Sequence, residues 1–199
     1  MLERAIVALG SNVGDRLAHL RAAVSAVREL PGVLGVKTSA LYETPALTLD
    51  GLGSIDGDDA FLNAAVAFET RLDPHALLAE LLGLETRLGR IPRSRRATWA
   101  PRPIDLDLLV HGDRHIDDDT LTLPHPRITE RWFVLAPLAD LAPSLRLRPS
   151  ARVANDEPKE DEPARTVRDW LGAIRADPRQ AASVGRIYAD ASWASASLG

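Results

Sequence analysis

The sequence has no cysteine, no long apolar run and no excess of basic residues. Without cysteine, the chain can form neither disulfides nor thiolate metal sites. Its apolar runs all fall short of the about 20 residues that span a membrane, so we expect no membrane association. The net charge of −4 argues against a chain that binds nucleic acid through its overall charge. The first residues lack the basic region and long apolar stretch of a signal peptide, and we expect a cytoplasmic enzyme or binding protein.

The 199 residues and their 45% apolar content suit one domain with a substantial hydrophobic core. We predict that this domain covers residues 1–177. A charged stretch at 155–165 is typical of a solvated linker and lies within it. Residues 178–199 are weakly patterned, and we expect this C-terminal tail to fray.

Hydrophobic periodicity and capping residues predict an order of strands and helices. We expect strands at 4–9, 33–43, 61–70 and 104–110, and helices at 16–30, 74–88, 127–140 and 166–176. The alternation within 33–43 predicts that Leu34 and Tyr42 share one face of a continuous strand. The helix at 127–140 is expected to bend or end near Pro137. Asp15, Asp73 and Thr166 are the expected caps of the first, second and last helices.

The first six elements follow the order β-α-β-β-α-β. This order predicts an α+β fold of the ferredoxin-like type, with an antiparallel sheet and both helices on one face. The other face is then open for a site. The remaining helices form a C-terminal helical extension.

Two acidic residues stand out in the last predicted strand of this unit. Asp105 and Asp107 alternate with apolar residues, so their side chains lie on the same face and repel each other unless a cation lies between them. Residues 86–103, just upstream, contain six arginines and no acid. A hard divalent metal on two carboxylates beside arginines suits polyphosphate chemistry. The alternative from the strand alone is a polar face turned to water. His111 and His115 have a zinc-like spacing, but they fall at a strand end and a turn, so we discount a zinc site.

Several short motifs occur together in a fixed order. They are Gly10-Ser-Asn12, Tyr42-Glu-Thr-Pro45, Phe61-Leu-Asn-Ala-Ala-Val66, Gly89-Arg90, Trp99-Ala-Pro-Arg-Pro-Ile-Asp-Leu-Asp107 and Leu123-Pro-His125. Over about residues 4–149, and again weakly near 166–174, the sequence strongly resembles the 6-hydroxymethyl-7,8-dihydropterin pyrophosphokinase family of folate biosynthesis. The resemblance implies a ferredoxin-like fold and a monomer. It also implies transfer of the β,γ-pyrophosphoryl unit of ATP to the pterin hydroxymethyl group, with AMP as the leaving group.

The resemblance also implies roles for individual residues. Two Mg²⁺ ions are expected on Asp105 and Asp107. The expected catalytic residues are Arg90, Arg102 and Asp107, with Asp107 as an acceptor of the hydroxymethyl proton. The expected ATP-binding residues are Glu85, Arg90, Arg93, Trp99, Arg102, Leu108, His125 and Arg131. The expected pterin-binding residues are Thr44, Pro45, Leu47, Phe61, Asn63, Trp99 and Phe133.

The sequence also departs from the family pattern. The Arg-rich loop is about two residues longer than usual, Ala100 replaces a glycine, and Phe61 stands where a tyrosine is common.

Taken alone, each candidate has a simpler explanation, since phenylalanines are usually core residues and a histidine between prolines is usually part of a turn. Two rival functions share some of these features: an RNA-binding module with aromatic residues on its open sheet, and a metal-dependent phosphohydrolase. Formation of AMP that depends on pterin separates the transferase from both.

Overall fold

A computed structural model describes residues 1–45, 47–48, 51–52, 60–91, 102–148, 163–177 and 185–195, with only the backbone described at 47–48 and 51–52. The helices are α1 (Arg16–Arg28), α2 (Pro74–Arg87), α3 (Trp132–Leu141), α4 (Val167–Ala176) and the short η3 (Ala191–Ala194). The longer strands are β1 (Glu3–Ser11), β2 (Val33–Thr38), β3 (Leu41–Thr44), β6 (Phe61–Thr70), β7 (Asp105–His111) and β12 (Arg186–Ala189). Three small two-stranded sheets are formed by β4 (Leu47–Thr48) with β5 (Gly51–Leu52), β8 (Ile116–Asp117) with β9 (Thr122–Leu123), and β10 (Arg146–Leu147) with β11 (Arg165–Thr166).

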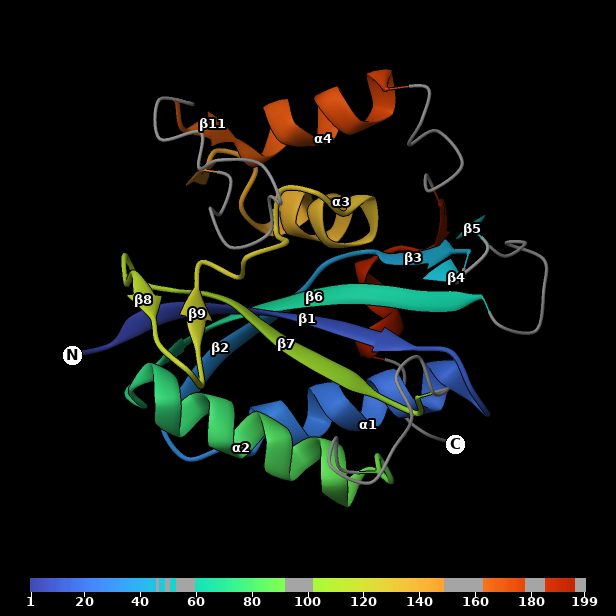
Figure 1. The fold of residues 1–199 in the computed structure, drawn as a ribbon. Coiled ribbons are helices and arrows are strands. Elements are labelled where there is room, and N and C mark those ends of the chain that lie inside the picture. Colours follow the sequence, from blue (N-terminus) through green and yellow to red (C-terminus); the bar gives the residue numbers. More distant parts are fainter. Residues whose placement is uncertain are drawn as a thin grey trace.

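The main sheet has six antiparallel strands around the two longest, β1 and β6. Its order is β12-β3-β6-β1-β7, and β2 pairs with β6 beside β3. Helices α1 and α2 cover one face of this sheet, whereas α3 and then α4 cover the other (Figure 1). The ferredoxin-like arrangement expected from the sequence is therefore present.

The helix boundaries follow from local capping. Asp15 accepts a hydrogen bond from Ala18 N at the start of α1, and Asp73 accepts from two amides at the start of α2. Proline stands in the first turn of α2, where its missing N–H leaves no bond unmade. Thr166 caps α4 in a reciprocal capping box with Asp169, as expected.

The predicted strand 33–43 is wrong as a single element. It forms β2 and β3, which pair with opposite halves of β6. Two residues of β2 stand opposite one residue of β6, and Gly35 within this bulge has a φ of 65°. A glycine in the left-handed region allows such a bulge, and the extra residue reverses the alternation of side chains. Leu34 therefore keeps the face of Tyr42, where it stands opposite Glu69 and is exposed, whereas Val36 beyond the bulge packs on the core of the α1 face.

The predictions for α3 and the open sheet face also need correction. The helix begins at Trp132 rather than near 127, and it continues through Pro137 to Leu141. Its apolar side chains pack on Ile6, Ala65 and Leu109 of the sheet and on α4. Burial of this face outweighs the intrinsic helix-breaking tendency of proline. Only the part of the sheet face beyond α3 is left for a site.

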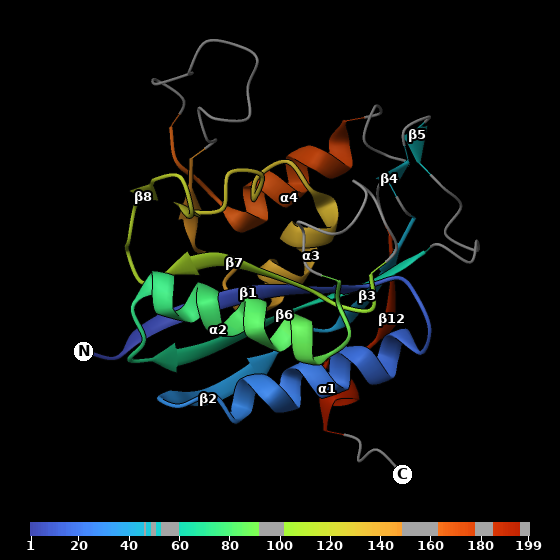
Figure 2. The ribbon, with the colours of Figure 1, turned by 60° about the horizontal axis from the view of Figure 1, so that its bottom comes forward.

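The sequence led us to expect that the C-terminal tail frays, but its described residues form defined structure. Residues 186–189 form β12 on the free edge of β3 (Figure 2). The Trp193 side chain is buried against the core under α1. Most of the predicted linker at 155–165 lies outside the described residues. Within the described part of the chain, no helix combines the length and apolar character needed to cross a membrane.

Candidate functional site

The paired acids of β7 lie on the sheet face that also carries α3. Gly10 of β1 stands opposite Asp105, and Ala8 stands opposite Asp107, so both carboxylates project from the same side of the sheet. Burial raises the pKa of Asp107, and the neighbouring charge of Asp105 raises it further. Arg131, Arg90 and Arg102 oppose this rise. A carboxylate whose proton affinity is raised by a second carboxylate beside it belongs to a site that a cation stabilises.

Two arginines from opposite ends of the Arg-rich loop meet on Asp105. Arg90 pairs with one carboxylate oxygen and Arg102 with the other. Arg90 follows α2 directly, and Gly89, with a φ of 90°, turns the chain so that Arg90 N donates to Glu85 O at 2.9 Å. Such guanidinium groups suit phosphate because their planar fork gives paired, charge-assisted hydrogen bonds.

Glu85 of α2 connects this helix to β7, the strand that carries the two aspartates. It is buried, forms an ion pair with Arg90, and accepts a hydrogen bond from Leu106 N at 2.7 Å. Burial raises the pKa of Glu85 to about 7, and the charges of the two aspartates add to this effect. Through these contacts Glu85 holds Arg90 and β7 in place, next to the residues for which the sequence predicts nucleotide binding.

Asn12 is a residue whose role the sequence did not reveal. Its side-chain oxygen accepts a hydrogen bond from Arg102 N at 2.8 Å, and its own N–H donates to Arg102 O at 3.2 Å. These bonds fix the backbone of Arg102 to the end of β1. The position of Asn12 in the Gly10-Ser-Asn12 motif was the available signal, but only the fold shows what it contacts.

His125 and Arg131 form the far side of the acidic cluster. His125 follows β9, where its N–H donates to Leu109 O of β7 at 2.8 Å. Burial lowers the pKa of His125 to about 4, with Arg131 and Arg127 contributing, so the imidazole is neutral at pH 7. Burial lowers the pKa of Arg131 as well, whereas Asp107 and Asp105 act in the opposite direction.

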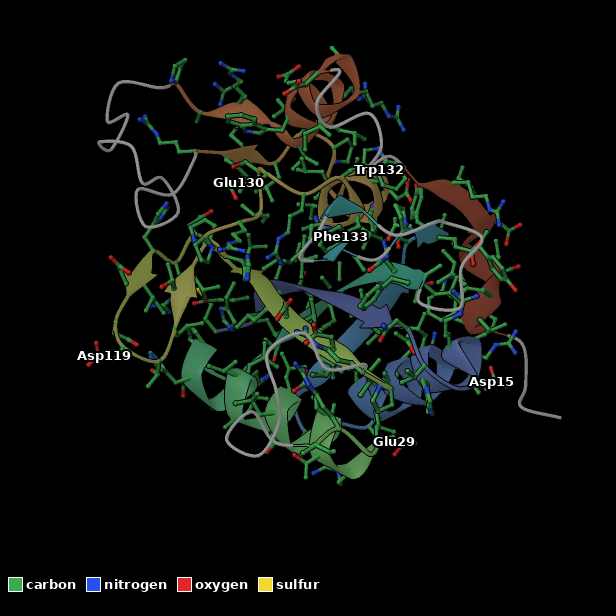
Figure 3. All side chains as sticks on the ribbon, turned by 45° about the vertical axis from the view of Figure 1, so that its right-hand side comes forward. Asp15, Glu29, Asp119, Glu130, Trp132 and Phe133 are labelled. Carbon is green, nitrogen blue, oxygen red and sulfur yellow. The ribbon has the colours of Figure 1, made fainter. Side chains whose placement is uncertain are left out.

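The candidate pterin residues lie on the next strands of the same face. Asn63 of β6 is buried, and its amide donates to the Thr44 hydroxyl of β3 at 2.8 Å. Phe61 stands opposite Thr44 in the register of the two strands. The first residue of α3 after Trp132 is Phe133, whose ring lies 5.5 Å from the Arg131 guanidinium and between α3 and the strands (Figure 3). Such rings can stack on a flat heterocycle.

Gly10 connects the acidic and amide parts of the site. It is the cross-strand partner of both Asn63 and Asp105. A methyl group at Gly10 would lie 3.3 Å from Asn63 Oδ1, 3.7 Å from Phe61 Cδ1 and 3.9 Å from Asp105 Cβ. The absence of a side chain there leaves the amide, the ring and the carboxylate facing the same small space.

The other predicted site residues are Pro45, Leu47, Arg93, Trp99 and Leu108. Arg93 and Trp99 lie outside the described residues, and only the backbone of Leu47 is described, in β4. Pro45 is buried at the end of β3. The prediction that Leu108 lines the ATP site is wrong for its side chain, which is buried in the core on the opposite face, under α1 and α2. Its alternation with Asp107 gives the reason.

The residues present fit a magnesium site. Among the described residues, no group of three or more His, Cys, Asp or Glu side chains is placed to hold a metal ion. Two carboxylates alone are what Mg²⁺ uses when phosphate oxygens and water complete its octahedron. A zinc site at His111 is unsupported, because this buried histidine contacts Glu3 and Leu72 O instead.

Comparisons with known proteins identify the family of the chain. The model of the family 7,8-dihydro-6-hydroxymethylpterin-pyrophosphokinase (HPPK) matches residues 6–143. A 2-amino-4-hydroxy-6-hydroxymethyldihydropteridine pyrophosphokinase of Methylorubrum extorquens is 46% identical over 144 residues, which is 72% of this chain and 85% of that protein. The protein of the same name from Bacillus subtilis is 43% identical over 137 residues, 69% of this chain and 77% of its own.

Solved structures show the same fold. The crystal structure of wild-type Plasmodium falciparum HPPK-DHPS superposes with a TM-score of 0.61 at 16% identity, and the match covers 92% of this chain and 47% of the other. This chain therefore spans just under half the length of that protein. The family match covers well over half of the 199 residues, and the chain belongs to the 7,8-dihydro-6-hydroxymethylpterin-pyrophosphokinase family.

Proposed function

We propose that the cluster around Asp105, Gly10 and Asn63 is the active centre of this chain. As a member of its family, the chain is an ATP-dependent pyrophosphokinase that acts on the hydroxymethyldihydropterin in folate biosynthesis. The pterin hydroxymethyl oxygen forms a bond to the β-phosphorus of ATP. The bond from that phosphorus to the oxygen bridging it to the α-phosphorus breaks, AMP leaves, and the hydroxyl proton passes to Asp107.

One observation carries the assignment of the site. Asn63, Gly10 and Asp105 lie side by side on three neighbouring strands and on one sheet face. An amide that offers both a donor and an acceptor suits the amide-like edge of a pterin. The carboxylates suit the metal that accompanies ATP. The two substrates can then meet above Gly10, where no side chain stands between them.

The acid pair is proposed to hold two magnesium ions with ATP. Bound there, the metal offsets charge on the phosphate oxygens. Asp105 and Asp107 supply its protein ligands, while Arg90 and Arg102 turn from Asp105 towards the phosphates. His125 and Arg131 bind phosphate from the other side, and Arg93 and Trp99 contact the nucleotide or the pterin. Pro45 and Leu47 contribute contacts to the pterin, whereas Leu108 can contribute only through its backbone.

The pterin is proposed to lie between Phe61 and Phe133, with its amide edge on Asn63 and Thr44. The hydrogen bond from Asn63 to Thr44 fixes the orientation of the side-chain amide. An RNA-binding role has less support, because α3 packs on the part of the sheet face that such a module would need for stacking bases.

The function is tested with the purified full chain, ATP, magnesium and 6-hydroxymethyl-7,8-dihydropterin, with AMP measured over time. We expect AMP only when pterin and magnesium are both present. Release of inorganic phosphate without pterin would instead identify a phosphohydrolase. The two-ion proposal predicts that the rate still rises with free magnesium after all ATP is in its magnesium complex. The monomeric state, tested by sedimentation, and the cytoplasmic location stay predictions.

A further inference from the structure

The described C-terminal residues 185–195 lie against the strand that carries Thr44. They lie well beyond residue 143, where the family match ends. Strand β12 pairs with β3 through Arg186 opposite Glu43 and Ile187 opposite Tyr42. On its other edge, β3 pairs with β6 of the substrate site. The four-residue strand β3 therefore lies between β6 of the site and β12 of the C-terminal segment, and Figure 2 shows β3 beside β12.

Gly185 makes the closest approach to the site. A methyl group on it would lie 2.1 Å from Glu43 O, 2.6 Å from Thr44 Cγ2 and 2.9 Å from Trp132 Cζ3. The first of these is a backbone atom, which cannot move away without shifting β3. Gly185 thus packs at once on the hydrogen-bond partner of Asn63 and on the residue before Phe133. The close packing, rather than an unusual backbone angle, requires glycine here.

Glu43 links this segment by charge to the part of the fold that the family model matches. Its side chain is buried, with one carboxylate oxygen 3.0 Å from Arg16 and the other 2.7 Å from Arg186. Arg16 also donates to Ala60 O at 2.6 Å, next to the start of β6. A buried carboxylate that loses one of two cations becomes undercompensated, so Arg186 helps to hold β3 in place.

The far end of the segment is anchored at the other end of β3. The Trp193 side chain is 4% exposed, and its indole N–H donates to Ser39 O at 2.9 Å. Arg21 of α1 donates to Trp193 O at 2.8 Å, and Thr38 donates to Ala191 O at 3.2 Å. These contacts fix the segment independently of any substrate, so it can impose a position on β3.

We propose that Gly185 and β12 position Thr44, and with it the Asn63 amide, for recognition of the pterin. The inference rests on the proposed function, since it assigns the pterin to Thr44 and Asn63. Gly185 and Arg186 are positioning residues, because they act on the substrate through β3. A segment that merely covered the sheet edge would affect stability but would not distinguish between the two substrates.

The test compares pterin and nucleotide affinities in the full chain carrying Gly185→Ala. We expect pterin to bind about tenfold more weakly, because overpacking of this kind displaces the neighbouring backbone. The dissociation constant for a non-hydrolysable magnesium–ATP analogue should stay at the wild-type value, as should kcat at saturating pterin. Gly172→Ala is the matched control: it lies on α4 with no heavy atom within 4 Å of the added carbon, and it should leave both affinities unchanged.

Arg186→Ala keeps the test decisive if Gly185→Ala does not fold. The Arg186 side chain is 56% exposed, so its removal leaves the core intact. We expect about threefold weaker pterin binding, in keeping with the modest energy of partly exposed ion pairs, and partial recovery in Arg186→Lys. If the variants that fold bind pterin as tightly as the wild type, the inference is overturned. An equal loss of affinity for both ligands also overturns it. Neither result contradicts the proposed function. Absence of pterin binding in the wild-type protein would overturn the proposed function together with it.

Discussion

The two ends of the site are built in different ways. At the acidic end, Asp105 and Asp107 are surrounded by charged groups from α2, the Arg-rich loop and the start of α3. At the pterin end, Asn63 and Thr44 form a single neutral hydrogen bond between two paired strands. The acidic end depends on long side chains brought together by loops, whereas the pterin end depends on strand register.

This difference predicts different consequences of mutation. Charged groups in a partly buried site act strongly on the developing charge of a transition state. A neutral hydrogen bond at fixed register selects a partner by shape and donor pattern, and leaving one half of it unpaired costs about 1–3 kcal/mol. Substitutions at the acidic end should therefore lower kcat, and those at the pterin end should weaken binding of one substrate.

Asp107→Asn should have the largest effect. The amide removes a metal ligand and the proposed proton acceptor together, so we expect kcat to fall by about 10³-fold or more. AMP formation at saturating substrates measures it. Asp119→Asn, at an exposed position away from the site (Figure 3), is the control. A near-normal kcat in Asp107→Asn would show that this carboxylate has no part in the reaction.

Arg102→Ala should have the next largest effect. Its guanidinium is proposed to contact charge that develops on the phosphates, so kcat should fall by about 10²–10³-fold. Arg114→Ala removes another arginine with a carboxylate partner, Glu3, outside the site and should leave kcat unchanged. An effect confined to KM would mean that Arg102 binds ground state and transition state equally.

Asn63→Ala should act on the pterin alone. We expect the pterin dissociation constant to rise by about 10- to 100-fold, the equivalent of one or two buried polar groups left unpaired. The affinity for a magnesium–ATP analogue should not change, and titration calorimetry measures both. Equal weakening of the two ligands would remove the distinction between the ends of the site.

The smallest effect concerns pH and stability without substrates. The pKa of His125 is about 4 in the folded chain and about 6.5 when unfolded, so the unfolded state binds the proton first as pH falls. The contribution of neutral His125 to the free energy of unfolding is fully present above pH 6.5 and is lost as pH falls from 6.5 to 4. The free energy of unfolding of the wild type, minus that of His125→Gln, should fall by about 1 kcal/mol or more over this range.

A difference measurement is needed here because Glu85 acts in the opposite direction. Its pKa is raised to about 7 in the folded chain, so its contribution weakens stability as pH rises from about 4.5 to 7. Chemical denaturation of the wild type and of His125→Gln is measured at several pH values, and the difference between the two cancels the Glu85 contribution. A difference that does not change with pH would show that His125 titrates alike in both states.

The sequence predicted those features that depend on near neighbours in the chain. The caps at Asp15, Asp73 and Thr166 and the periodic helices α1, α2 and α4 form as expected. The sequence did not reveal the bulge at Gly35, since alternation alone does not show where a register shifts. The sequence predicted a helix at 127–140 but not its start at Trp132 or its continuation through Pro137, because its stability comes from packing on distant strands.

By itself, the sequence determined that Asp105 and Asp107 share a face, because side chains two apart on a strand point the same way. It also determined the order of motifs that identifies the family. Only the tertiary structure decided that Asn63, Gly10 and Asp105 stand in one row, and that Gly185 packs on Thr44. These contacts join segments far apart in the chain, and their register is fixed by the packing of the whole sheet rather than by any local pattern.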